Sequence, residues 1–457
     1  MSAGRTLLLF SDGHNRFRGM FIMTKEELKI KACKAIDARR DEIIAFADSV
    51  ASEPELGFKE VKTSDKFVSL LESLGREPRC NVAITGVVDE YTGKDSGLKV
   101  AVMGELDAIL VPDHPDADPV TGAVHACGHN AQLASIAAIA YALHDTDIMD
   151  NLGGNIVLMG VPAEEYVEIT YRKKLRDEGK LWFLSGKQEF IRLGVFDDID
   201  ISVMQHSATR FPGFKAGASS ICTGFAGKLI NYTGKGAHAG AAPFDGINAL
   251  NAAMLGLMAV HAQRETFKDE DHIRVHPIIT KGGDIVNVVP ADVRLETYVR
   301  GANTEAIIAA SEKVNRAFRS GADAVGARCD IVELPGYLPV VQCDMLNEMM
   351  VREMENTVGE DVMKICPGFG GGSTDQGDVS QLMPSIQSFF ACVNGGLHST
   401  DFCLIDKELG IITAAKTMLC LVIELLYGDA SQAKRVKNEF KPVLTKEEYL
   451  RMWGGLE

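Results

Sequence analysis

The sequence lacks an excess of positive charge, paired cysteines and long uncharged hydrophobic runs. Its 47 Lys and Arg are outnumbered by 63 Asp and Glu, which gives a net charge of −16 over 457 residues. A protein that binds a nucleic-acid backbone needs a basic surface to displace counterions, so we expect no nucleic-acid partner. The 46% hydrophobic and 24% charged residues are ordinary for a folded soluble protein and exclude disordered, collagen-like and low-complexity classes.

The ten cysteines are scattered along the chain and include no C-x-x-C pair. A chain of this length can bury a core without disulfides, so its cysteines are expected to pack as small hydrophobic residues. This usage predicts a reducing, cytoplasmic compartment.

The hydrophobic runs are short or interrupted by charge. Leu7 to Phe10 is shorter than the hydrophobic region of a signal peptide. The run from Ile411 to Tyr427 contains Lys416 and Glu424, which favours a buried helix over a membrane span. We therefore expect no membrane partner.

The length predicts two or three domains. Thr24, followed three residues later by Glu27, predicts a helix start with a capping box, so residues 1–23 are interpreted as an extension of uncertain order. Helical periods are expected over 25–51 and 61–74. From residue 24 to about 222, such helices alternate with short β-branched runs, a pattern typical of an α/β sheet.

Three predicted strands are each followed by polar residues. The strands are expected over 98–104, 155–160 and 199–204. They lead into Asp107, into Glu164 and Glu165, and into Gln205 and His206. Because the carboxyl ends of parallel strands meet at one edge of a sheet, we expect a functional site along that edge.

The composition changes near residue 222. The expected order is a strand at 225–232, a helix at 248–264, strands at 278–289 and 292–300, a helix at 304–319 and a strand near 328–333. This β-α-β-β-α-β order is typical of a small ferredoxin-like α+β domain. The α/β pattern returns from 336 to 457, so the fold class is a larger α/β domain with mixed sheet, formed by 24–222 and 336–457, with a smaller domain inserted at 223–335.

A thiol and an imidazole lie two residues apart in His125-Ala-Cys127-Gly-His129. In an extended segment such residues point to the same side and can reach one metal ion. The alternative is a buried cysteine beside a histidine that caps the following helix.

Adjacent carboxylates in a turn, as in Glu164-Glu165, point in different directions. One can bind a metal while the other faces a water, which is the arrangement that metal-assisted hydrolysis needs. The alternative is a solvated acidic turn.

Two further histidines complete a candidate ligand set. His206 could instead be a core histidine, and His398 lies in the glycine-rich segment Gly395–Asp401. The complete set is Cys127, His129, Glu165, His206 and His398. Five such ligands suffice for two divalent ions about 3.5–4 Å apart. Cysteine and histidine suit zinc, while the carboxylates also accept manganese or cobalt.

The same residues carry a resemblance to a known family. The sequence resembles the dinuclear amidohydrolase/carboxypeptidase family that includes aminoacylase, carboxypeptidase G and the indoleacetyl-amino-acid hydrolases. It is most similar to the branch with the B-type aminobenzoyl-glutamate hydrolase and the Xaa-Arg dipeptidase, over roughly residues 25–427. The motifs are Gly104-Glu-Leu-Asp-Ala-Ile, His125-Ala-Cys-Gly-His-Asn, Pro162-Ala-Glu-Glu and Gly372-Ser-Thr-Asp-Gln-Gly-Asp-Val-Ser380.

The resemblance implies a catalytic domain of the zinc-peptidase type, with Cys127 as a thiolate bridging two metals. Glu164 would be the base that activates the bridging water and then protonates the leaving amine. Asp107 would orient a ligating histidine. The alternative for Asp107 is a cap at the strand end.

The resemblance also implies that the inserted domain is a dimerisation lid. His238 would reach the partner subunit's site in a homodimer and stabilise the oxyanion. Asn287 and Arg300 would contact substrate, the arginine by gripping a free carboxylate; the alternative for Arg300 is a surface ion pair. Asp375, in the glycine-rich loop from Gly370, would touch a substrate amine or cap a turn.

Two features depart from the family pattern. The interval from Glu165 to His206 spans 41 positions (206 − 165), longer than expected, with the excess in 166–184. This segment could reshape the substrate pocket or form a solvated surface helix. Asn130 replaces an Asp of the indoleacetyl-type members, as it does in the branch named above.

We therefore expect an enzyme that hydrolyses an amide or peptide bond in a small N-acyl or aminoacyl amino acid, such as aminobenzoyl-glutamate or a dipeptide. One alternative is a general deacylase or dipeptidase that does not accept aminobenzoyl-glutamate. Another is a non-catalytic, metal-binding scaffold subunit that pairs with an active homologue.

Overall fold

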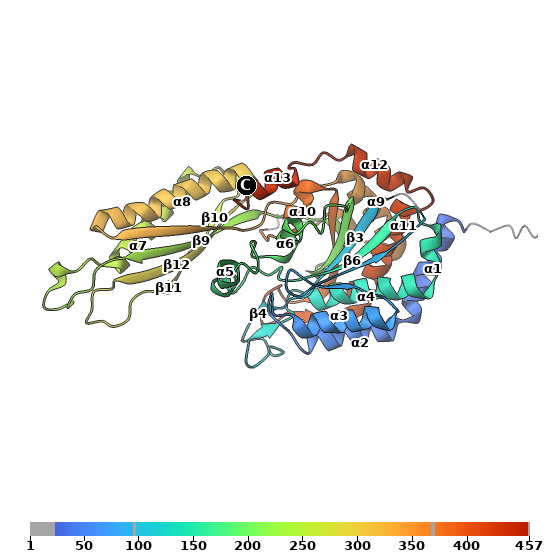
Figure 1. Cartoon of the computed structure of the whole chain (residues 1–457), viewed down its shortest axis with the longest axis horizontal. Helices are drawn as coiled ribbons and strands as arrows, with labels where there is room; N and C mark the ends of the chain where they lie inside the picture. Colours follow the sequence, from blue (N-terminus) through green and yellow to red (C-terminus); the bar gives the residue numbers. More distant parts are fainter. Residues whose placement is uncertain (1–22, 95–96, 367–370, 456–457) are drawn as a thin grey trace, which may run out of the picture.

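The computed structural model describes residues 23–94, 97–366 and 371–455, so the expected N-terminal extension lies outside them apart from its last residue. Two sheets organise the chain and lie at opposite ends of an elongated molecule (Figure 1). The larger has nine strands and the smaller has five. The expected α/β class with a large mixed sheet is confirmed.

The large sheet has the strand order β1-β2-β6-β3-β7-β15-β8-β14, with β16 paired to β15. Its strands are β1 (Arg79–Val82), β2 (Gly86–Tyr91), β3 (Lys99–Glu105), β6 (Asn155–Val161), β7 (Ile201–Thr209), β8 (Ala216–Ser219), β14 (Val362–Ile365), β15 (Ser385–Asn394) and β16 (Cys403–Leu404). The central strands β6, β3, β7 and β15 run parallel, so their carboxyl ends share one edge. A separate ribbon pairs β4 (Ile109–Leu110) with β5 (Ala123–Val124).

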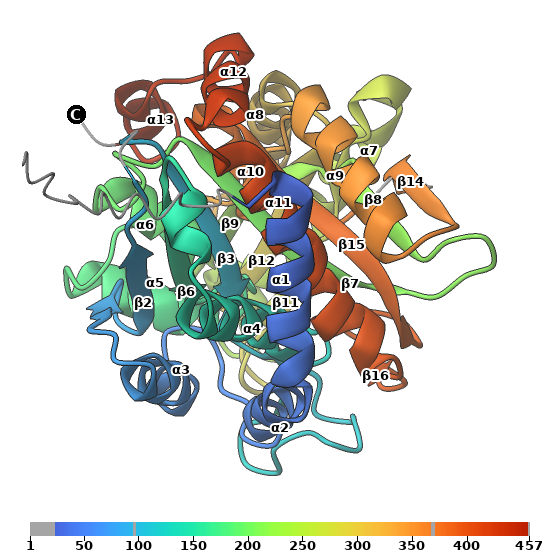
Figure 2. The same cartoon turned by 90° about the vertical axis from the view of Figure 1, so that its right-hand side faces the viewer.

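Both faces of the large sheet are covered by helices. Along β3, Val100 and Val102 enter one hydrophobic core, while Ala101 and Met103 enter the other, as the two-residue period of a strand requires. The first core is built with α1 (Lys25–Ala38), α2 (Arg40–Ala51), α3 (Val61–Ser73), α4 (His129–Asp145), α9 (Asp344–Thr357), α11 (Ala414–Leu426) and α12 (Ser431–Glu439). The second is built with α6 (Gly186–Arg192), α10 (Gln376–Leu382) and α13 (Lys446–Met452). Figure 2 shows α1, α4 and α11 together on the first face.

The N-terminal helices begin as expected. The Thr24 hydroxyl accepts a hydrogen bond from the Glu27 N–H at 3.3 Å, and the Glu27 carboxylate accepts one from the Thr24 N–H at 2.8 Å. This capping box is confirmed. The expected single helical period over 25–51 is instead two helices, because the backbone leaves the helical region at Arg39.

The predicted core helix near the C-terminus is also confirmed. One described segment, Glu408–Leu426, is long and apolar enough to cross a membrane by length and hydropathy alone, and 78% of its most apolar window is buried inside the molecule. It comprises a π-helical turn over Glu408–Thr413 followed by α11.

The small sheet comes from residues 224–335. Its strands are β9 (Gly224–Thr233), β10 (Arg274–Val275), β11 (Ile278–Lys281), β12 (Asp292–Gly301) and β13 (Arg328–Pro335). The helices α7 (Ala249–Ala262) and α8 (Thr304–Val325) pack on it (Figure 1). All pairings are antiparallel, and β10 and β11 both pair with β12, so together they form one interrupted edge strand of a ferredoxin-like sheet.

The expected strand over 278–289 was too long. It ends at Lys281, where Gly282 and Gly283 follow, and Gly283 has a φ of 136°. This is a backbone conformation that residues with a Cβ rarely adopt, so it ends the ladder.

The long interval after Glu165 forms α5 (Ile169–Asp177) and α6, and α5 lies between the two sheets (Figure 1). It is not a fully solvated helix, because Ile169, Arg172 and Leu175 are buried. Ile169 and Leu175 belong to a hydrophobic cluster with Tyr166, Phe225, Tyr298 and Tyr337, next to the small sheet, and the Arg172 guanidinium lies 5.4 Å from the ring centre of Phe58 in the same cluster.

Candidate metal centre

The expected ligands gather at the carboxyl edge of the central strands. Glu165 follows β6, while Cys127 and His129 lie just before and at the start of α4. The sequence predicted that His206 follows the end of its strand, but His206 lies inside β7. The ladder continues past it because β15 pairs with β7 as far as Thr209.

Cys127 is the centre of the cluster. Its Sγ lies 3.3 Å from His206 Nε2 and 3.2 Å from His398 Nε2. His398 Nε2 lies 2.9 Å from Glu165 Oε1. Two groups of possible ligands therefore share the thiol: Cys127 with His129 and His206, and Cys127 with Glu165 and His398. Within each group the ligand atoms lie within 4.8 Å of one another.

Gly128 allows Cys127 and His129 to reach the same point. We expected this segment to be extended, but it turns at Gly128, which has a φ of 85° and precedes α4. A Cβ at this position would lie 2.4 Å from Ser207 Oγ on β7. Both the backbone conformation and the close approach to the neighbouring strand therefore require glycine.

His129 is held by Asp107. Its Nδ1 lies 2.8 Å from the Asp107 carbonyl and 3.2 Å from Asp107 Oδ1, which leaves Nε2 to face the cluster. The other oxygen of Asp107 accepts the Glu165 N–H at 2.9 Å. Asp107 thus touches the residues on both sides of the cluster, as an orienting carboxylate does.

Glu164 and Glu165 are buried rather than part of a solvated turn, with 7% and 6% of their surfaces exposed. The preceding Ala163 has a φ of 55°, which is unusual for a residue with a Cβ. Two buried charged side chains fix its peptide groups. The Ala163 N–H donates to Glu60 Oε1 at 2.7 Å, and its carbonyl accepts from Arg172 Nη1 at 3.2 Å.

The two carboxylates have opposite pKa shifts. Burial raises the pKa of Glu164 well above its usual value, and the nearby charges of Glu105 and Glu165 add to the shift. Burial also acts to raise the pKa of Glu165, but the hydrogen bond and charge of His398 outweigh it and lower that pKa. Neighbouring carboxyls whose environments push their pKa values apart are suited to separate roles as proton carrier and anionic ligand.

A buried ion cluster beside the base was not predicted from the sequence. Lys187 Nζ lies 2.5 Å from Glu105 Oε1 and 2.5 Å from Asp375 Oδ1, and all three side chains are fully buried. Glu105 Oε2 also lies 3.0 Å from His129 Nε2. The motif that carries Asp107 could have drawn attention to Glu105, but no local pattern marks Lys187 as buried.

This ion cluster revises the expectation for Asp375. Its Oδ1 accepts a hydrogen bond from the side-chain ammonium of Lys187, and its Oδ2 accepts one from the backbone N–H of Lys187 at 3.0 Å. It also makes no side-chain cap on α10. Its position fits the support of the site rather than contact with a substrate amine.

His238 and Asn287 are not brought to the cluster within the chain. Both are exposed on loops of the small sheet, where the Ala239 N–H donates to the Asn287 carbonyl at 2.9 Å and His238 bridges to Val288. Neither lines the cavity at the metal ligands.

Arg300 is not among the residues that line that cavity, but it contacts Ser373, which is one of them. Its Nη1 donates to Ser373 Oγ at 2.7 Å, and its guanidinium lies 5.1 Å from the ring centre of Phe225. No carboxylate pairs with it among the described residues, so the expected alternative of a surface ion pair is not what the structure shows there.

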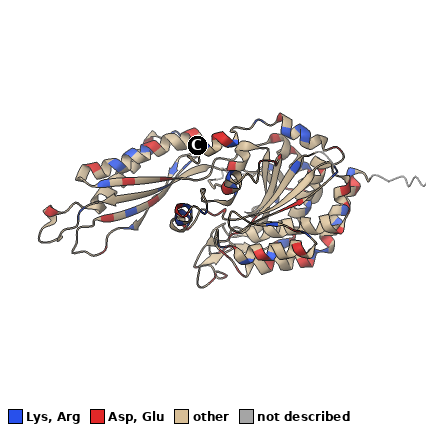
Figure 3. Ribbon diagram, viewed as in Figure 1, with Lys and Arg blue, Asp and Glu red and all other residues tan. Residues whose placement is uncertain are grey.

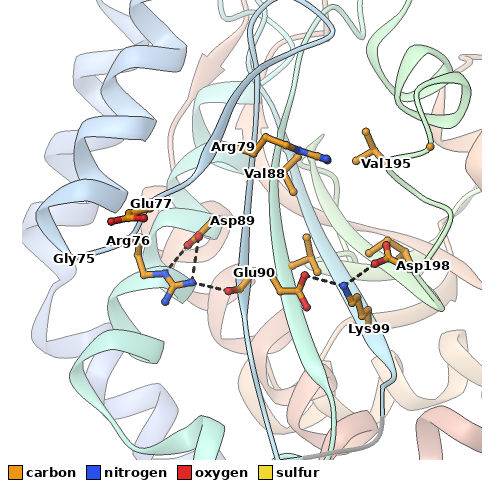
Figure 4. Close-up of a pocket in the computed structure, with 13 residues that line it drawn as sticks. Gly75, Arg76, Glu77, Arg79, Val88, Asp89, Glu90, Lys99, Val195 and Asp198 are labelled. Atoms are coloured by element: carbon orange, nitrogen blue, oxygen red, sulfur yellow. Dashed lines mark hydrogen bonds and ion pairs between the residues drawn. The ribbon is translucent and has the colours of Figure 1, made fainter.

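The cavity above the cluster has a volume of about 530 Å³. Cys127, Glu164, Glu165, His206 and His398 are part of its lining. A polar cavity of about 650 Å³ opens at the other end of the strands, where Arg76 bonds Asp89 and Lys99 bonds Glu90 and Asp198 (Figure 4). Its described lining residues include no cysteine or histidine, so the candidate metal site is in the smaller cavity.

The donor set fits divalent metal ions. It combines a thiol, imidazole nitrogens and a carboxylate, which are the ligands that zinc and similar ions prefer. Among the described residues, the buried His129 Nε2 has no hydrogen bond of good geometry. Without a cation, burial raises the pKa of the Cys127 thiol well above its usual value, and a bound metal would reverse this.

Acidic and basic residues are mixed on the helices that cover the described part of the chain. Figure 3 shows acidic and basic residues interspersed along α8 and along α1 to α3, while the strands of the large sheet are largely uncharged. The concentration of ionisable groups at the carboxyl edge is therefore a local feature of the site.

Known proteins are similar to this chain in sequence and in fold. Residues 101–423 match the sequence model of the peptidase family M20/M25/M40. The Xaa-Arg dipeptidase of Mus musculus is 26% identical over 451 residues, which cover 93% of this chain and 95% of the dipeptidase. A dinuclear metal-binding M20 peptidase from Bacillus subtilis is similar in structure, with a TM-score of 0.62, 21% identity and coverage of 85% and 99%. An aminobenzoyl-glutamate utilization protein from Klebsiella pneumoniae has a TM-score of 0.63, 17% identity and coverage of 86% and 98%.

Proposed function

The chain belongs to the peptidase family M20/M25/M40 and is a hydrolase of amide or peptide bonds, and from this premise we propose that it releases a free amino acid from an N-acyl or aminoacyl amino acid with the help of two divalent ions. The observation that carries the proposal is the pair of ligand groups that share Cys127, with Glu164 beside them in a third group with Glu105 and His129.

Each ligand group would hold one ion. Glu165 and His398 with Cys127 would hold the first, and His129 and His206 with the same thiolate would hold the second. The thiol and imidazoles favour zinc, and manganese or cobalt is also compatible with the carboxylate. When bound, such ions supply a Lewis acid that polarises a carbonyl and lowers the pKa of water.

Glu164 would move the proton. Its carboxylate takes a proton from the attacking water and then gives it to the departing amine. The raised pKa of Glu164 suits a group that must hold the proton between these two steps. Glu60 binds the N–H of the residue before Glu164, and Asp107 binds the N–H of the residue after it. The Glu164 carboxylate is therefore held in one position.

Arg300 would bind the free carboxylate of the substrate. It is a cation without a carboxylate partner among the described residues, and it donates to Ser373, which lines the cavity. A guanidinium can bind a carboxylate through two parallel hydrogen bonds, which would orient the scissile amide over the cluster.

The arrangement further supports a homodimer. We assign residues 24–222 and 336–457 to a catalytic domain and 223–335 to a dimerisation lid. His238 is exposed and lies away from its own chain's cavity, so it would serve the partner's site as an oxyanion donor. Exposed apolar side chains on the same part of the chain support a partner surface. They are Met254, Met258, Ile278, Ile279, Ile285 and Val286.

The central test replaces Glu164 by Gln. We expect the Glu164→Gln variant to bind both metals and to lose kcat by roughly 10²–10⁴, because the proton carrier is removed while the ligands remain. The measurements are metal content and release of amino acid from aminobenzoyl-glutamate and from dipeptides, before and after chelation.

The matched control is Glu168→Gln, four residues on, where the carboxylate only pairs with Lys59 at 2.7 Å. It should leave kcat within about twofold, because an exposed ion pair contributes little. Near-parental activity of Glu164→Gln would refute the assigned role. Two bound metals with no turnover of any amide by the parent would favour the non-catalytic scaffold subunit.

A further inference from the structure

A pair of free thiols faces each other between two helices, outside the site of the proposed hydrolysis. Cys33 on α1 and Cys420 on α11 are separated by 387 positions in the sequence, yet their Sγ atoms lie 3.7 Å apart. Neither is among the described residues that line the cavity at the metal ligands. A disulfide bond is about 2.05 Å long, so small rotations of the two side chains would bring the sulfurs to bonding distance.

Ion pairs on both sides hold these thiols opposite each other. Asp37 of α1 pairs with Lys416 of α11 one helical turn to one side of the thiols, and Lys29 pairs with Glu424 at 2.9 Å one turn to the other side. Each of these residues is four positions from the thiol on its own helix, so it lies on the same helix face. Lys29 is buried and also contacts Glu353 on α9 at 2.6 Å. The two helices therefore run antiparallel in a register that sets one thiol against the other.

The two thiols differ in exposure and in acidity. Cys33 is partly exposed, whereas Cys420 is buried. The hydrogen bond from Cys420 and the charge of Lys416 lower the pKa of Cys33, although burial opposes them. The same hydrogen bond, together with burial, raises the pKa of Cys420. Because the thiolate is the reactive form, Cys33 is suited to meet an oxidant from solvent and Cys420 to react second.

We propose that Cys33 and Cys420 form a redox-sensitive modification site, in which a hydroperoxide oxidises Cys33 and Cys420 then closes a reversible disulfide between α1 and α11. In the first step the Cys33 thiolate attacks hydrogen peroxide. An S–O bond forms, the O–O bond breaks, and the departing hydroxide takes a proton from solvent, which leaves Cys33 as a sulfenic acid.

The second step forms the disulfide. The Cys420 sulfur attacks the Cys33 sulfur, the S–O bond breaks, and the hydroxide leaves as water with the proton of Cys420. In total the two thiols lose two electrons, and one peroxide is reduced to two waters. A dithiol reductant reverses the modification by thiol–disulfide exchange.

The disulfide would tie the first described helix to a core helix. Figure 2 shows α1 beside α11, and most of α11 is buried. A cross-link from residue 33 to residue 420 closes a loop that contains most of the chain, which restricts the unfolded state. Oxidation at this site therefore stabilises the fold and leaves the candidate metal ligands unmodified.

The test treats the fully reduced, metal-loaded protein with hydrogen peroxide and maps its peptides without reduction. We expect the main product to be a peptide pair joined through Cys33 and Cys420. The oxidised protein should melt about 2–6 °C higher than the reduced one, and a dithiol should abolish the difference. Cys80 is the internal comparison because it is exposed and its pKa is raised by partial burial. Cys33 should be oxidised at least about threefold faster than Cys80.

Variants separate the roles of the two thiols. In Cys420→Ala, Cys33 should stop at the sulfenic acid, which a 1,3-diketone reagent traps, and the melting temperature should not rise. In Cys33→Ala, the buried Cys420 should remain reduced. Lys416→Met should slow oxidation of Cys33 by roughly threefold to tenfold, because the cation beside the thiolate is lost. Lys416→Arg is the matched control, since it keeps the charge and should keep the rate within about twofold.

The proposal is overturned if peroxide oxidises Cys80 in the parent and no Cys33–Cys420 peptide pair forms. Equal trapping of sulfenic acid at Cys33 in the parent and in Cys420→Ala would likewise exclude Cys420 as the second thiol. A cross-link that leaves the melting temperature unchanged would remove the stabilising role. Amide hydrolysis is measured separately, so its failure and the failure of this site are distinguishable.

Discussion

Three residues of the candidate site have unusual backbone conformations. Gly128, Ala163 and His398 all have positive φ, at 85°, 55° and 59°. Such conformations cost about 1–3 kcal/mol for residues with a Cβ and persist only where neighbours enforce them. For Ala163 the enforcing neighbours are visible, since Glu60 and Arg172 hold its two peptide groups. The geometry around Glu164, the proposed base, is thus set by residues outside the candidate ligand set.

Glu60 predicts a pH-dependent stability. It is fully buried, accepts from Thr85 Oγ1 at 2.7 Å as well as from Ala163, and burial with the Asp107 charge raises its pKa to about 7. The folded state therefore keeps a proton that the unfolded chain loses above its ordinary value of 4.5. This stabilising contribution is complete below about pH 4.5 and is lost as the pH rises through about 7, by roughly 3 kcal/mol in total.

The measurement is urea unfolding of the parent and of Glu60→Gln between pH 4.5 and 8. The free energy of unfolding of the parent, relative to the variant, should fall across this range, because glutamine cannot ionise. Glu72→Gln, on the exposed side of α3, should give a difference that does not change with pH. A parent that gains stability relative to Glu60→Gln as the pH rises would contradict the shift.

At the scale of elements, short-range patterns predicted much of the structure. The β-branched runs located β3, β6 and β7, because strands buried on both faces read as continuous apolar segments. The ligands could be located because each lies within a short motif next to a strand or helix. The capping box at Thr24 was equally local.

Features that depend on distant segments could not be predicted. Lys187 looks like an ordinary surface lysine until β3 and the loop before α10 bring Glu105 and Asp375 to it. The contact between the rings of His206 and Phe389 forms only when β15 pairs with β7. These contacts join residues 82 to 188 positions apart, and no period or spacing in the sequence predicts them.

The helix α5 gives a prediction at this scale. Arg172 is buried, donates to the carbonyls of Ala163 and Leu184, and has no carboxylate partner among the described residues. Arg172→Met should lower the free energy of unfolding by about 2–4 kcal/mol, because two buried acceptors lose their donor. It should also lower kcat, since the Ala163 turn positions the base. Both are measured against Arg176→Met.

Arg176 lies on the same helix but is half-buried and stacks on Trp182 at 4.4 Å, so its replacement should cost less than about 1 kcal/mol. Equal losses in the two variants would show that α5 contributes through general packing rather than through the guanidinium. Loss of stability with kcat intact would show that the turn keeps its geometry without Arg172.

At the scale of the whole molecule, the candidate metal ligands and His238 lie apart within one chain, although the proposed reaction needs both at one site. The metal ligands lie at the edge of the large sheet, while His238 lies exposed on the small sheet with the apolar side chains around Val286 and Met258. A twofold dimer through the small sheet can place the loop of one chain over the cavity of the other. Such an interface is self-complementary, so both sites would be completed at once.

Mixing two inactive variants tests this assembly. In a dimer of one Glu164→Gln chain and one His238→Ala chain, one site combines both defects, while the other combines an intact Glu164 with the partner's intact His238. After unfolding and refolding of an equal mixture, half of the dimers are mixed and each has one working site, so about a quarter of the parental kcat per chain should return. If His238 acts within its own chain, every site carries a defect and no activity returns. Adding Met258→Glu to both chains is the control, because a buried charge at the dimer surface should give monomers that keep their metals but regain no activity.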